Sequence, residues 1–370
     1  MSEPNADLLI ELVRRASPSG QEAAAVAFLV DWMRAHGFAA YVDSAGNAIG
    51  IRGPEHARFT LMLLGHIDTV PGQIPVAVRD GVLYGRGSVD AKGALAAFAE
   101  AAAQAAPPDG WRVVVAGAVC EETDSRGAYH IRDSFEPDAC IIGEPSGVDR
   151  VALGYKGHVW FRYTLAQPET HSSRPEPSVG ALGAAFWHAI VDWAEHTNQG
   201  YARHFDHVVP NLNAINTHSD GLEAVVEMSI SFRLPPRLSP DDVRAAIAPL
   251  AAPGARLEMD RGVTAYLGAK DNALVRAMVG AIRTQGRRPA FVLKSGTSDM
   301  NVVCTRWRCP LIAYGPGDSH LDHTPDEHLP LDDYATAIAT LRHFIEHLEP
   351  ASEVASPQGT TLPAKRRGDL

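Results

Sequence analysis

Cysteine, positive charge and long apolar runs are all scarce in this chain of 370 residues. Its four cysteines include no Cys-x-x-Cys pair, which argues against a disulfide scaffold or structural zinc and indicates small buried thiols in a reducing compartment. The formal net charge of -11 argues against a protein that mainly binds nucleic acid. The longest apolar run, near residues 113–120, is too short to cross a membrane, and the acidic first residues are unlike a signal peptide. We therefore expect a soluble cytoplasmic protein.

The composition that remains is globular, with 45% hydrophobic and 21% charged residues, and the chain is long enough for two domains. The first third alternates helical patterns with apolar strands at residues 59–64, 111–119 and 139–142. Nearly continuous apolar strands are typical of a parallel sheet that is covered on both faces. The sequence therefore predicts an α/β fold, with a mostly parallel sheet sandwiched by helices.

The middle of the chain has a different pattern. Alternating strands, such as residues 158–165, are combined with a long helix over residues 179–198. This order indicates a small two-layer α+β domain that is inserted into the larger one. The expected parts are a discontinuous catalytic domain (1–153 with 263–348), an inserted lid or dimerisation domain (154–262) and a disordered tail (349–370).

Polar side chains of the metal-ligand type follow the apolar strands or lie in loops near them. Five segments share this placement: His66-Ile67-Asp68, residues 85–93 with Asp90, Glu121-Glu122, Gly143-Glu144-Pro145, and residues 320–327 with His323. Open α/β sheets place their sites at the carboxyl ends of strands. His, Asp and Glu without Cys suit zinc, or a related metal such as cobalt, in a catalytic site. Each segment alone has a structural explanation, such as a helix cap at Asp90, but the five together favour a metal site.

Spacing gives two of these segments a more specific interpretation. His66 and Asp68 project to the same side of an extended chain, so Asp68 is placed to hold the second ring nitrogen of a metal-bound imidazole. Glu121 and Glu122 are adjacent carboxylates, which repel each other unless a cation holds them. Because neighbours on a strand point in opposite directions, one of the pair could ligate a metal while the other faces the substrate.

In this order, the motifs resemble those of the M20 zinc peptidases and amidohydrolases, over about residues 5–348. That family includes deacylases of acetylornithine and succinyl-diaminopimelate, and carboxypeptidases that release glutamate. The resemblance implies two zinc or cobalt ions that are bridged by Asp90. His66 and Glu144 would complete one site, and Glu122 and His323 would complete the other.

The resemblance also implies roles for residues that are not ligands. Asp68 would orient His66, Glu121 would be the general base, and the Asp90–Ala91 peptide bond would be cis. His171 resembles the family's small-domain histidine, which reaches the active site of the neighbouring subunit, and this implies a homodimer. Without the resemblance, His171 would be interpreted as a solvated loop residue.

Residues for the substrate follow from the same resemblance. Arg233 resembles a strand-borne arginine that binds a substrate carboxylate. Lys294, Gly296 and Thr297 resemble a loop that supplies backbone and hydroxyl donors to that carboxylate, and Asn211 is expected to line the pocket. The alternatives are a surface arginine, an ordinary turn before a helix cap, and a turn that is stabilised by side-chain amides.

Residues 294–301 and 315–325 most resemble one branch of the family. Its members release lysine or ornithine from an acidic amino-group carrier protein, LysW, in amino-acid biosynthesis, and N-acetyl-lysine is the nearest small-molecule substrate. Docking of an acidic carrier would need a local basic patch, for which the candidates are Arg283, Arg287, Arg288 and Lys294. The alternatives are a dipeptidase, a carboxypeptidase or another N-acyl-amino-acid deacylase on the same fold, and a catalytically silent carrier-binding protein.

Overall fold

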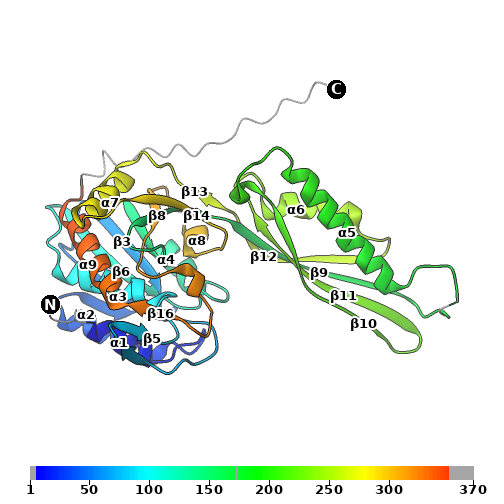
Figure 1. The fold of residues 1–370 in the computed structure, drawn as a ribbon, viewed down its shortest axis with the longest axis horizontal. Helices are drawn as coiled ribbons and strands as arrows, with labels where there is room; N and C mark the ends of the chain where they lie inside the picture. The colour runs from blue at the N-terminus through cyan, green and yellow to red at the C-terminus, as the bar shows by residue number, and fades with distance from the viewer. Residues whose placement is uncertain (1–5, 172, 350–370) are drawn as a thin grey trace, which may run out of the picture. The chain divides into compact units, whose positions relative to one another are not determined.

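The structure, a computed structural model, describes residues 6–171 and 173–349 (Figure 1). These residues form two compact units. The first unit comprises residues 6–151, 268–290 and 306–349, and the second comprises residues 152–267 and 291–305. Except for residue 349, the predicted tail lies outside the described residues. No helix in the described ranges is long and apolar enough to cross a bilayer.

A mostly parallel sheet forms the centre of the first unit. Its strands are β1 (Ala39–Val42), β2 (Ala48–Arg52), β3 (Phe59–His66), β6 (Trp111–Ala118), β7 (Ala139–Gly143) and β15 (Leu311–Ala313). Within this unit they follow the order β1-β2-β6-β3-β7-β15. β3 is parallel to β6 and β7, and β15 is parallel to β7, whereas β1 and β2 are antiparallel to their neighbours. The predicted α/β fold is confirmed.

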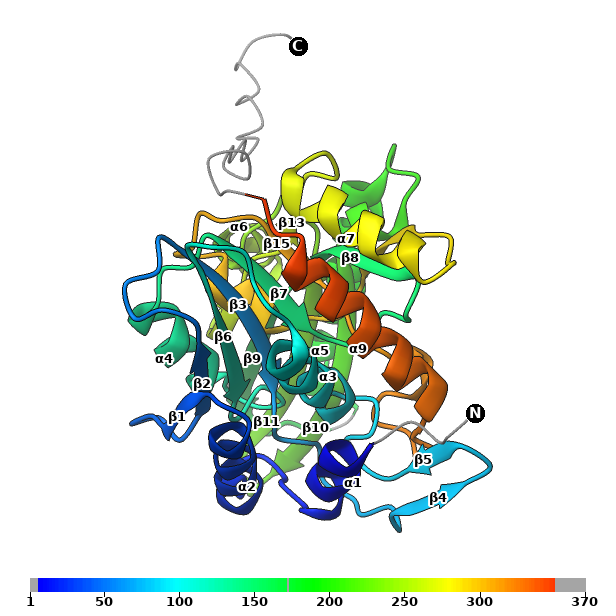
Figure 2. The ribbon, with the colours of Figure 1, turned by 90° about the vertical axis from the view of Figure 1, so that its left-hand side faces the viewer.

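Helices cover this sheet. They are α1 (Asp7–Arg14), α2 (Ala23–Ala35), α3 (Lys92–Gln104), α4 (Arg126–Ser134), α7 (Ala273–Thr284) and α9 (Leu331–Glu346), with a short 3-10 helix η3 (Ser319–Leu321). α3 packs against β3, β6 and β7, and α9 packs against α3 and α7. Figure 2 shows α3 and α9 side by side in front of the sheet. α3 is buried along residues 92–102, because its many alanine side chains fit the narrow space between the sheet and α9.

A small antiparallel sheet completes the first unit. Its strands are β4 (Ala77–Arg79), β5 (Val82–Tyr84) and β16 (His328–Pro330), in the order β16-β5-β4. The turn between β4 and β5 is Asp80-Gly81, and both residues have positive φ, as a two-residue hairpin turn requires. Such an Asp-Gly turn between two short strands is the local signal of a hairpin. By pairing with β5, β16 brings the end of the predicted 320–327 loop close to Gly85, whose N–H donates to the Glu327 carbonyl oxygen at 3.3 Å.

The second unit contains the predicted two-layer arrangement. Its main sheet consists of β9 (Gly157–Pro168), β10 (Val209–Ser219), β11 (Glu223–Leu234) and β12 (Arg256–Val263), and its helices are α5 (Val179–Asn198), η1 (His204–Asp206), α6 (Pro240–Ile247) and η2 (Ala248–Leu250). The strands are antiparallel and follow the order β10-β11-β9-β12. Burial alternates along β9, because one face of the sheet packs in an apolar core with α5 and α6.

The sequence does not predict β10. Polar and apolar residues are mixed along it and most are exposed, so neither an apolar run nor an alternating pattern reveals an edge strand. The alternative of a turn at residues 211–213 is wrong, because Asn211 pairs with Ser231 of β11. Pairing shifts between Leu212 and Ala214, and the Asn211 amide donates to Asn213 Oδ1 at 2.5 Å across this irregularity.

Residues 291–305 group with the second unit, although the sequence assigned them to the first. The strands and helix concerned are β8 (Arg150–Tyr155), β13 (Tyr266–Leu267), β14 (Ala290–Lys294) and α8 (Asp299–Val303). β14 pairs with β8, and the Asn301 amide donates to the carbonyl oxygens of Lys156 and Thr264 at 3.0 and 2.8 Å. The domain boundaries expected from the sequence stay a prediction.

A buried carboxyl group lies between α3 and α9. Glu100 is 9% exposed and accepts a hydrogen bond from the Tyr334 hydroxyl at 3.1 Å. Burial raises the pKa of Glu100 from 4.5 to about 6, although the tyrosine hydrogen bond opposes the shift. Above pH 6 the folded protein therefore holds a charge that is poorly solvated.

We expect Glu100→Gln to increase the free energy of unfolding at pH 8 by about 1–2 kcal/mol, and to give no increase at pH 4. The pKa of Glu100 is raised in the folded state, so this carboxyl group destabilises the fold as the pH rises through 4.5 to about 6. Glutamine keeps an oxygen acceptor for Tyr334 and carries no charge. Urea unfolding at the two pH values measures the effect, and an equal change at both would contradict the explanation.

Candidate metal centre

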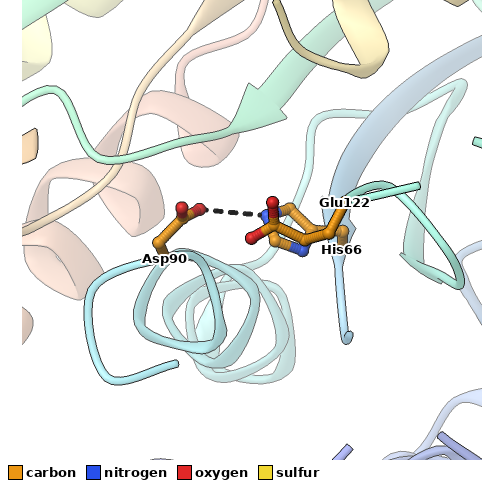
Figure 3. Close-up of side chains that lie close together, drawn as sticks. All are labelled: His66, Asp90 and Glu122. Atoms are coloured by element: carbon orange, nitrogen blue, oxygen red, sulfur yellow. Dashed lines mark hydrogen bonds and ion pairs between the residues drawn. The ribbon is translucent and has the colours of Figure 1, made fainter. Parts of the chain in front are cut away.

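Three side chains from distant parts of the chain meet at the carboxyl end of the parallel sheet (Figure 3). His66 is the last residue of β3, Glu122 follows β6, and Asp90 precedes α3. One ligand atom from each lies within 4.8 Å of the others. His66 Nε2 is 3.1 Å from Asp90 Oδ1. Parallel strands end at the same edge of a sheet, which is why residues so far apart in sequence converge here.

His323 contacts two members of this group. Its Nε2 atom lies 3.0 Å from Asp90 Oδ2 and 3.0 Å from Glu122 Oε1. The two oxygens of Asp90 therefore face different histidines, His66 on one side and His323 on the other. His323 has a φ of 61°, an uncommon conformation for a residue with a side chain and one that is found at functional sites. The Asp90–Ala91 peptide bond is cis, as the resemblance implies.

Glu144 follows β7 directly and is buried at the same edge of the sheet. Among the described residues, the ligand atoms that all lie within 4.8 Å of one another belong to His66, Asp90 and Glu122. Glu144 is not a member of this group. Its role as a ligand stays a prediction. His320, the neighbouring alternative to His323, is exposed, and its Nδ1 atom contacts Asp318 at 2.7 Å.

Asp68 holds several parts of the site together. It is fully buried, and its carboxylate accepts hydrogen bonds from the Glu121 N–H, the Glu122 N–H and the Ser19 hydroxyl at 3.0, 3.2 and 2.7 Å. His66 Nδ1 lies 3.0 Å from the Asp68 carbonyl oxygen and 3.5 Å from its carboxylate. Burial would raise the pKa of Asp68, but the contact with His66 and these hydrogen bonds lower it. Asp68 thus fixes the ring of His66 and also the backbone of Glu121 and Glu122.

Glu121 and Glu122 lie in a turn, not on a strand. β6 ends at Ala118, and Cys120 has a φ of 60°, which turns the chain before the two carboxylates. The argument that neighbours on a strand point in opposite directions therefore does not apply here. Glu122 contacts His323, whereas the negative charge of Glu121 lies close enough to His66 to raise its pKa.

The donor set fits divalent cations. It combines imidazole nitrogens with carboxylate oxygens, the usual protein ligands of catalytic zinc. Hydrogen bonds with Asp90 and Glu122 raise the pKa of His323 to about 10. Burial lowers the pKa of His66, but hydrogen bonds with Asp68 and Asp90 outweigh it and raise the pKa well above its ordinary value. The carboxylates thus create a negative potential that protons or metal ions can neutralise.

A second buried carboxylate fixes the backbone of Asp90. Glu327 is fully buried, and its Oε1 atom accepts hydrogen bonds from the Val89 and Asp90 N–H groups at 2.9 and 3.1 Å. Its Oε2 atom pairs with Arg86 Nη1 at 2.7 Å. Sequence reasoning placed Glu327 in a motif but gave it no role. The segment that carries His323 therefore also holds the loop of Asp90.

Lys92 is a further residue that the sequence analysis missed. Its side chain is fully buried, and Nζ donates to the carbonyl oxygens of Leu12 and Arg15 at 3.0 and 2.8 Å. A cation is favourable at the carboxyl end of a helix, so Lys92 binds the end of α1 to the start of α3. Burial lowers the pKa of Lys92 to about 8.

The residues predicted for substrate binding belong to the second unit. Arg233 on β11 donates to the Thr297 hydroxyl at 3.2 Å, and Lys294 ends β14 close to Gly296 in the chain. His171 is exposed, and its Nδ1 atom is 2.8 Å from the Ser173 hydroxyl. Of the predicted basic patch, residues 283, 287 and 288 are exposed in the first unit, whereas residue 294 is in the second. The roles of all these residues stay predictions.

Residues 62–347 match the model of peptidase family M20/M25/M40. The chain belongs to this family. Over 358 residues it is 44% identical to the LysW-lysine hydrolase of Deinococcus radiodurans, with 93% of this chain and 98% of that protein covered. Aminopeptidase PepT of Bacillus cereus has the same fold, with a TM-score of 0.74 at 17% identity and coverage of 92% and 97%. A dinuclear metal-binding M20 peptidase of Bacillus subtilis aligns with a TM-score of 0.67 at 11% identity, covering 92% and 96%.

The resemblance inferred from the motifs is confirmed by these comparisons. The chain is a hydrolase that acts on amide bonds.

Proposed function

We propose that this M20 hydrolase releases lysine, or ornithine, from an amino-group carrier protein of the LysW type. The proposal depends on one observation, the contact of four metal-ligand side chains: His66, Asp90, Glu122 and His323. They belong to a chain that is 44% identical to a LysW-lysine hydrolase. That similarity extends over nearly the full length of both proteins. Dipeptidases share the fold but have much lower sequence identity to this chain, so the similarity favours a LysW-type substrate over a dipeptide.

Asp90 would bridge two zinc or cobalt ions. His66 and Glu144 would complete the ligands of one ion, and Glu122 and His323 would complete those of the other. The contacts of His66 and His323 with opposite oxygens of Asp90 support this assignment. When bound, the ion pair supplies Lewis acidity to a scissile carbonyl and lowers the pKa of water.

Glu121 is the group that would move protons. Its backbone is held by Asp68, and it neighbours the ligand Glu122 in the chain. A carboxylate in this place takes a proton from the attacking water and later gives it to the leaving amine of lysine. Asp68 keeps both glutamates in position through their N–H groups.

The carboxylate of the released amino acid would bind to Arg233 and Thr297, with Lys294, Gly296 and Asn211 nearby in the second unit. Arg233 and Thr297 are already in contact, so the arginine is oriented before substrate arrives. His158 lies opposite Arg233 in the pairing of β9 and β11, and burial, together with Arg233, lowers its pKa to about 4. A neutral His158 can donate a hydrogen bond to this carboxylate.

We also propose a homodimer formed through the second unit, in which His171 serves the site of the other subunit. β10 is a long strand at an edge of its sheet, and such edges readily pair with another chain. Subunit exchange tests the idea. Mixed dimers of His171→Ala and Glu121→Ala chains should recover activity, because one of the two sites then has both groups. Recovery would be absent if His171 acted within its own chain.

The reaction is tested by incubating the zinc- or cobalt-loaded enzyme with a lysine-carrier conjugate, an ornithine-carrier conjugate, N-acetyl-lysine and a panel of dipeptides. We expect the carrier conjugates to have the highest kcat/KM. Exclusive cleavage of dipeptides would instead identify a dipeptidase. No hydrolysis of any compound with either metal would identify a silent carrier-binding protein.

We expect His323→Ala to reduce the metal content from two equivalents per chain to about one. The change removes the imidazole that contacts Asp90 and Glu122, while His66 and its partners stay in place. His320→Ala is the matched control, because His320 is three residues away and contacts Asp318 instead. Metal analysis after dialysis measures the outcome, and loss of one equivalent in the His320 variant alone would transfer the ligand role to that residue.

We infer a cytoplasmic location for the enzyme. The cysteines in the described residues are all free thiols, and Cys120 and Cys140 are buried. Free thiols persist in reducing compartments. Fractionation of cells with a tagged full-length chain tests the location.

A further inference from the structure

A buried carboxylate that is not part of the metal group binds the turn that carries Glu121 and Glu122. Glu22 comes immediately before α2 and is 4% exposed. Its Oε1 atom accepts hydrogen bonds from the N–H groups of Gly20 and Cys120 at 2.8 and 3.2 Å, and from the Cys120 thiol at 3.2 Å. Glu22 therefore holds the residue that directly precedes Glu121 in the chain.

Together, Glu22 and Asp68 fix three consecutive backbone groups of this turn. The N–H of Cys120 donates to Glu22. The next two N–H groups, those of Glu121 and Glu122, donate to Asp68. The φ of Cys120 is 60°, a conformation that is uncommon for a residue with a side chain and that persists where surrounding contacts enforce it. The hydrogen bond to Glu22 is such a contact.

The first donor to Glu22 belongs to a segment that is bound to the residues after β3. The Ser19 hydroxyl donates to the Asp68 carboxylate at 2.7 Å, and its N–H donates to the Thr69 carbonyl oxygen at 3.2 Å. Gly20 follows directly. Glu22 therefore connects the residues that follow β3 with the turn that follows β6. Both places supply side chains to the metal centre, so this connection sets their relative position.

The base of the turn is held separately by Asn47. This side chain is fully buried, its Oδ1 atom accepts from the Val119 N–H at 3.0 Å, and its amide donates to the Gly127 carbonyl oxygen at 3.1 Å. The Gly127 N–H also donates to the Val119 carbonyl oxygen at 3.2 Å. Because the base is closed in this way, loss of the Glu22 carboxylate should displace the residues next to Cys120 without opening the whole turn.

We infer that Glu22 is a positioning residue, which keeps Glu121 where it can take a proton from the attacking water. The inference rests on the role that the proposed function gives to Glu121. Misplacement of a reacting group by about 1 Å can cost about 10²-fold in rate. Glu121 is the first residue after the N–H that Glu22 holds. Glu122 should be displaced less, because it is one residue further along and its carboxylate contacts His323.

Three substitutions of Glu22 separate the reach of its side chain from its charge. Glu22→Gln keeps an oxygen where the three hydrogen bonds meet, Glu22→Asp keeps the charge on a shorter side chain, and Glu22→Ala removes both. We expect kcat to fall by about 10- to 100-fold in the Asp and Ala variants and by less than about threefold in the Gln variant. KM should stay within about twofold of the wild-type value, because the effect is on the chemical step. Metal content should be unchanged in all three, since each keeps the proposed ligands.

Met33→Ala is the control for lost stability. Met33 is fully buried near the other end of α2, so its truncation should lower the melting temperature and leave kcat unchanged wherever the variant is folded. All rates are measured at a temperature at which every variant is folded, with whichever substrate the wild-type protein cleaves. Cleavage of dipeptides without cleavage of carrier conjugates would contradict the proposed substrate, and the Glu22 variants would then be compared on the dipeptide.

Two results would overturn the inference. Wild-type kcat in folded Glu22→Ala would show that Glu22 only stabilises the fold. Full activity of Glu22→Asp together with an inactive Glu22→Gln would show that the charge of the carboxylate matters and its hydrogen bonds do not. Loss of metal in proportion to the loss of kcat would assign the effect to the ligand Glu122 and would likewise contradict the role proposed for Glu22.

Discussion

Glu121→Ala is expected to reduce turnover by about 10²- to 10⁴-fold while the protein keeps its full metal content. The structure distinguishes Glu121 from its neighbour, because Glu122 contacts His323 directly, whereas the charge of Glu121 raises the pKa of His66. Loss of the Glu121 carboxylate therefore removes a proton acceptor and leaves the proposed ligands. KM for the substrate should change little, since the effect is on the chemical step.

Two variants in the same turn make this expectation specific. Glu122→Ala should lose metal as well as activity, because it removes a partner of His323. Asp124→Asn, a change of charge in the same turn outside the metal group, should leave metal content unchanged and activity near that of the wild type. Metal analysis and single-turnover rates are measured on each protein. If Glu121→Ala loses as much metal as Glu122→Ala, then Glu121 is a ligand and not the proton carrier.

The parts of the fold that are buried on both faces could be predicted from the sequence. The segments around β3, β6 and β7 are apolar runs, and each is followed by the side chain that later joins or adjoins the metal centre. The prediction succeeds because a parallel strand that is covered on both faces is apolar along its whole length, and polar side chains occur only at its ends. The hairpin of β4 and β5 was predictable for a local reason, since its Asp-Gly turn determines the geometry by itself.

What the sequence did not predict depends on contacts between distant segments or on exposed edges. β10 is an exposed edge strand, and its polar and apolar residues show no regular alternation. Glu327 and Arg86 are 241 residues apart, and neither position carries a local signal of a buried ion pair. Similarly, the sequence indicates only an ordinary helix residue at Lys92, because its hydrogen bond with the end of α1 depends on how the two helices pack. Such residues position the proposed metal ligands or the segments that carry them, and their importance can be inferred only from the structure.

Glu327 has the second large expected effect. Its carboxylate holds the N–H groups of Val89 and Asp90 and pairs with Arg86, all within a buried environment. Glu327→Ala removes the acceptor of the Arg86 guanidinium and of two backbone N–H groups. Breaking a buried ion pair in this way lowers the free energy of unfolding by about 3–5 kcal/mol. Because Asp90 is the proposed bridge between both metal sites, a small displacement of its backbone should affect both.

We therefore expect Glu327→Ala to weaken metal binding by about 10- to 100-fold and to lower kcat, even at temperatures where the variant is fully folded. Glu327→Gln keeps an oxygen for the two N–H groups and should recover most of the metal affinity but not the stability from the Arg86 pair. Ile345→Ala, a buried change in α9 of the same unit, is the control for instability alone, and it should lower the melting temperature with normal metal binding. Metal titrations of the three folded variants distinguish the roles. If the Glu327→Ala and Ile345→Ala proteins bind metal equally well, Glu327 stabilises the fold without positioning Asp90.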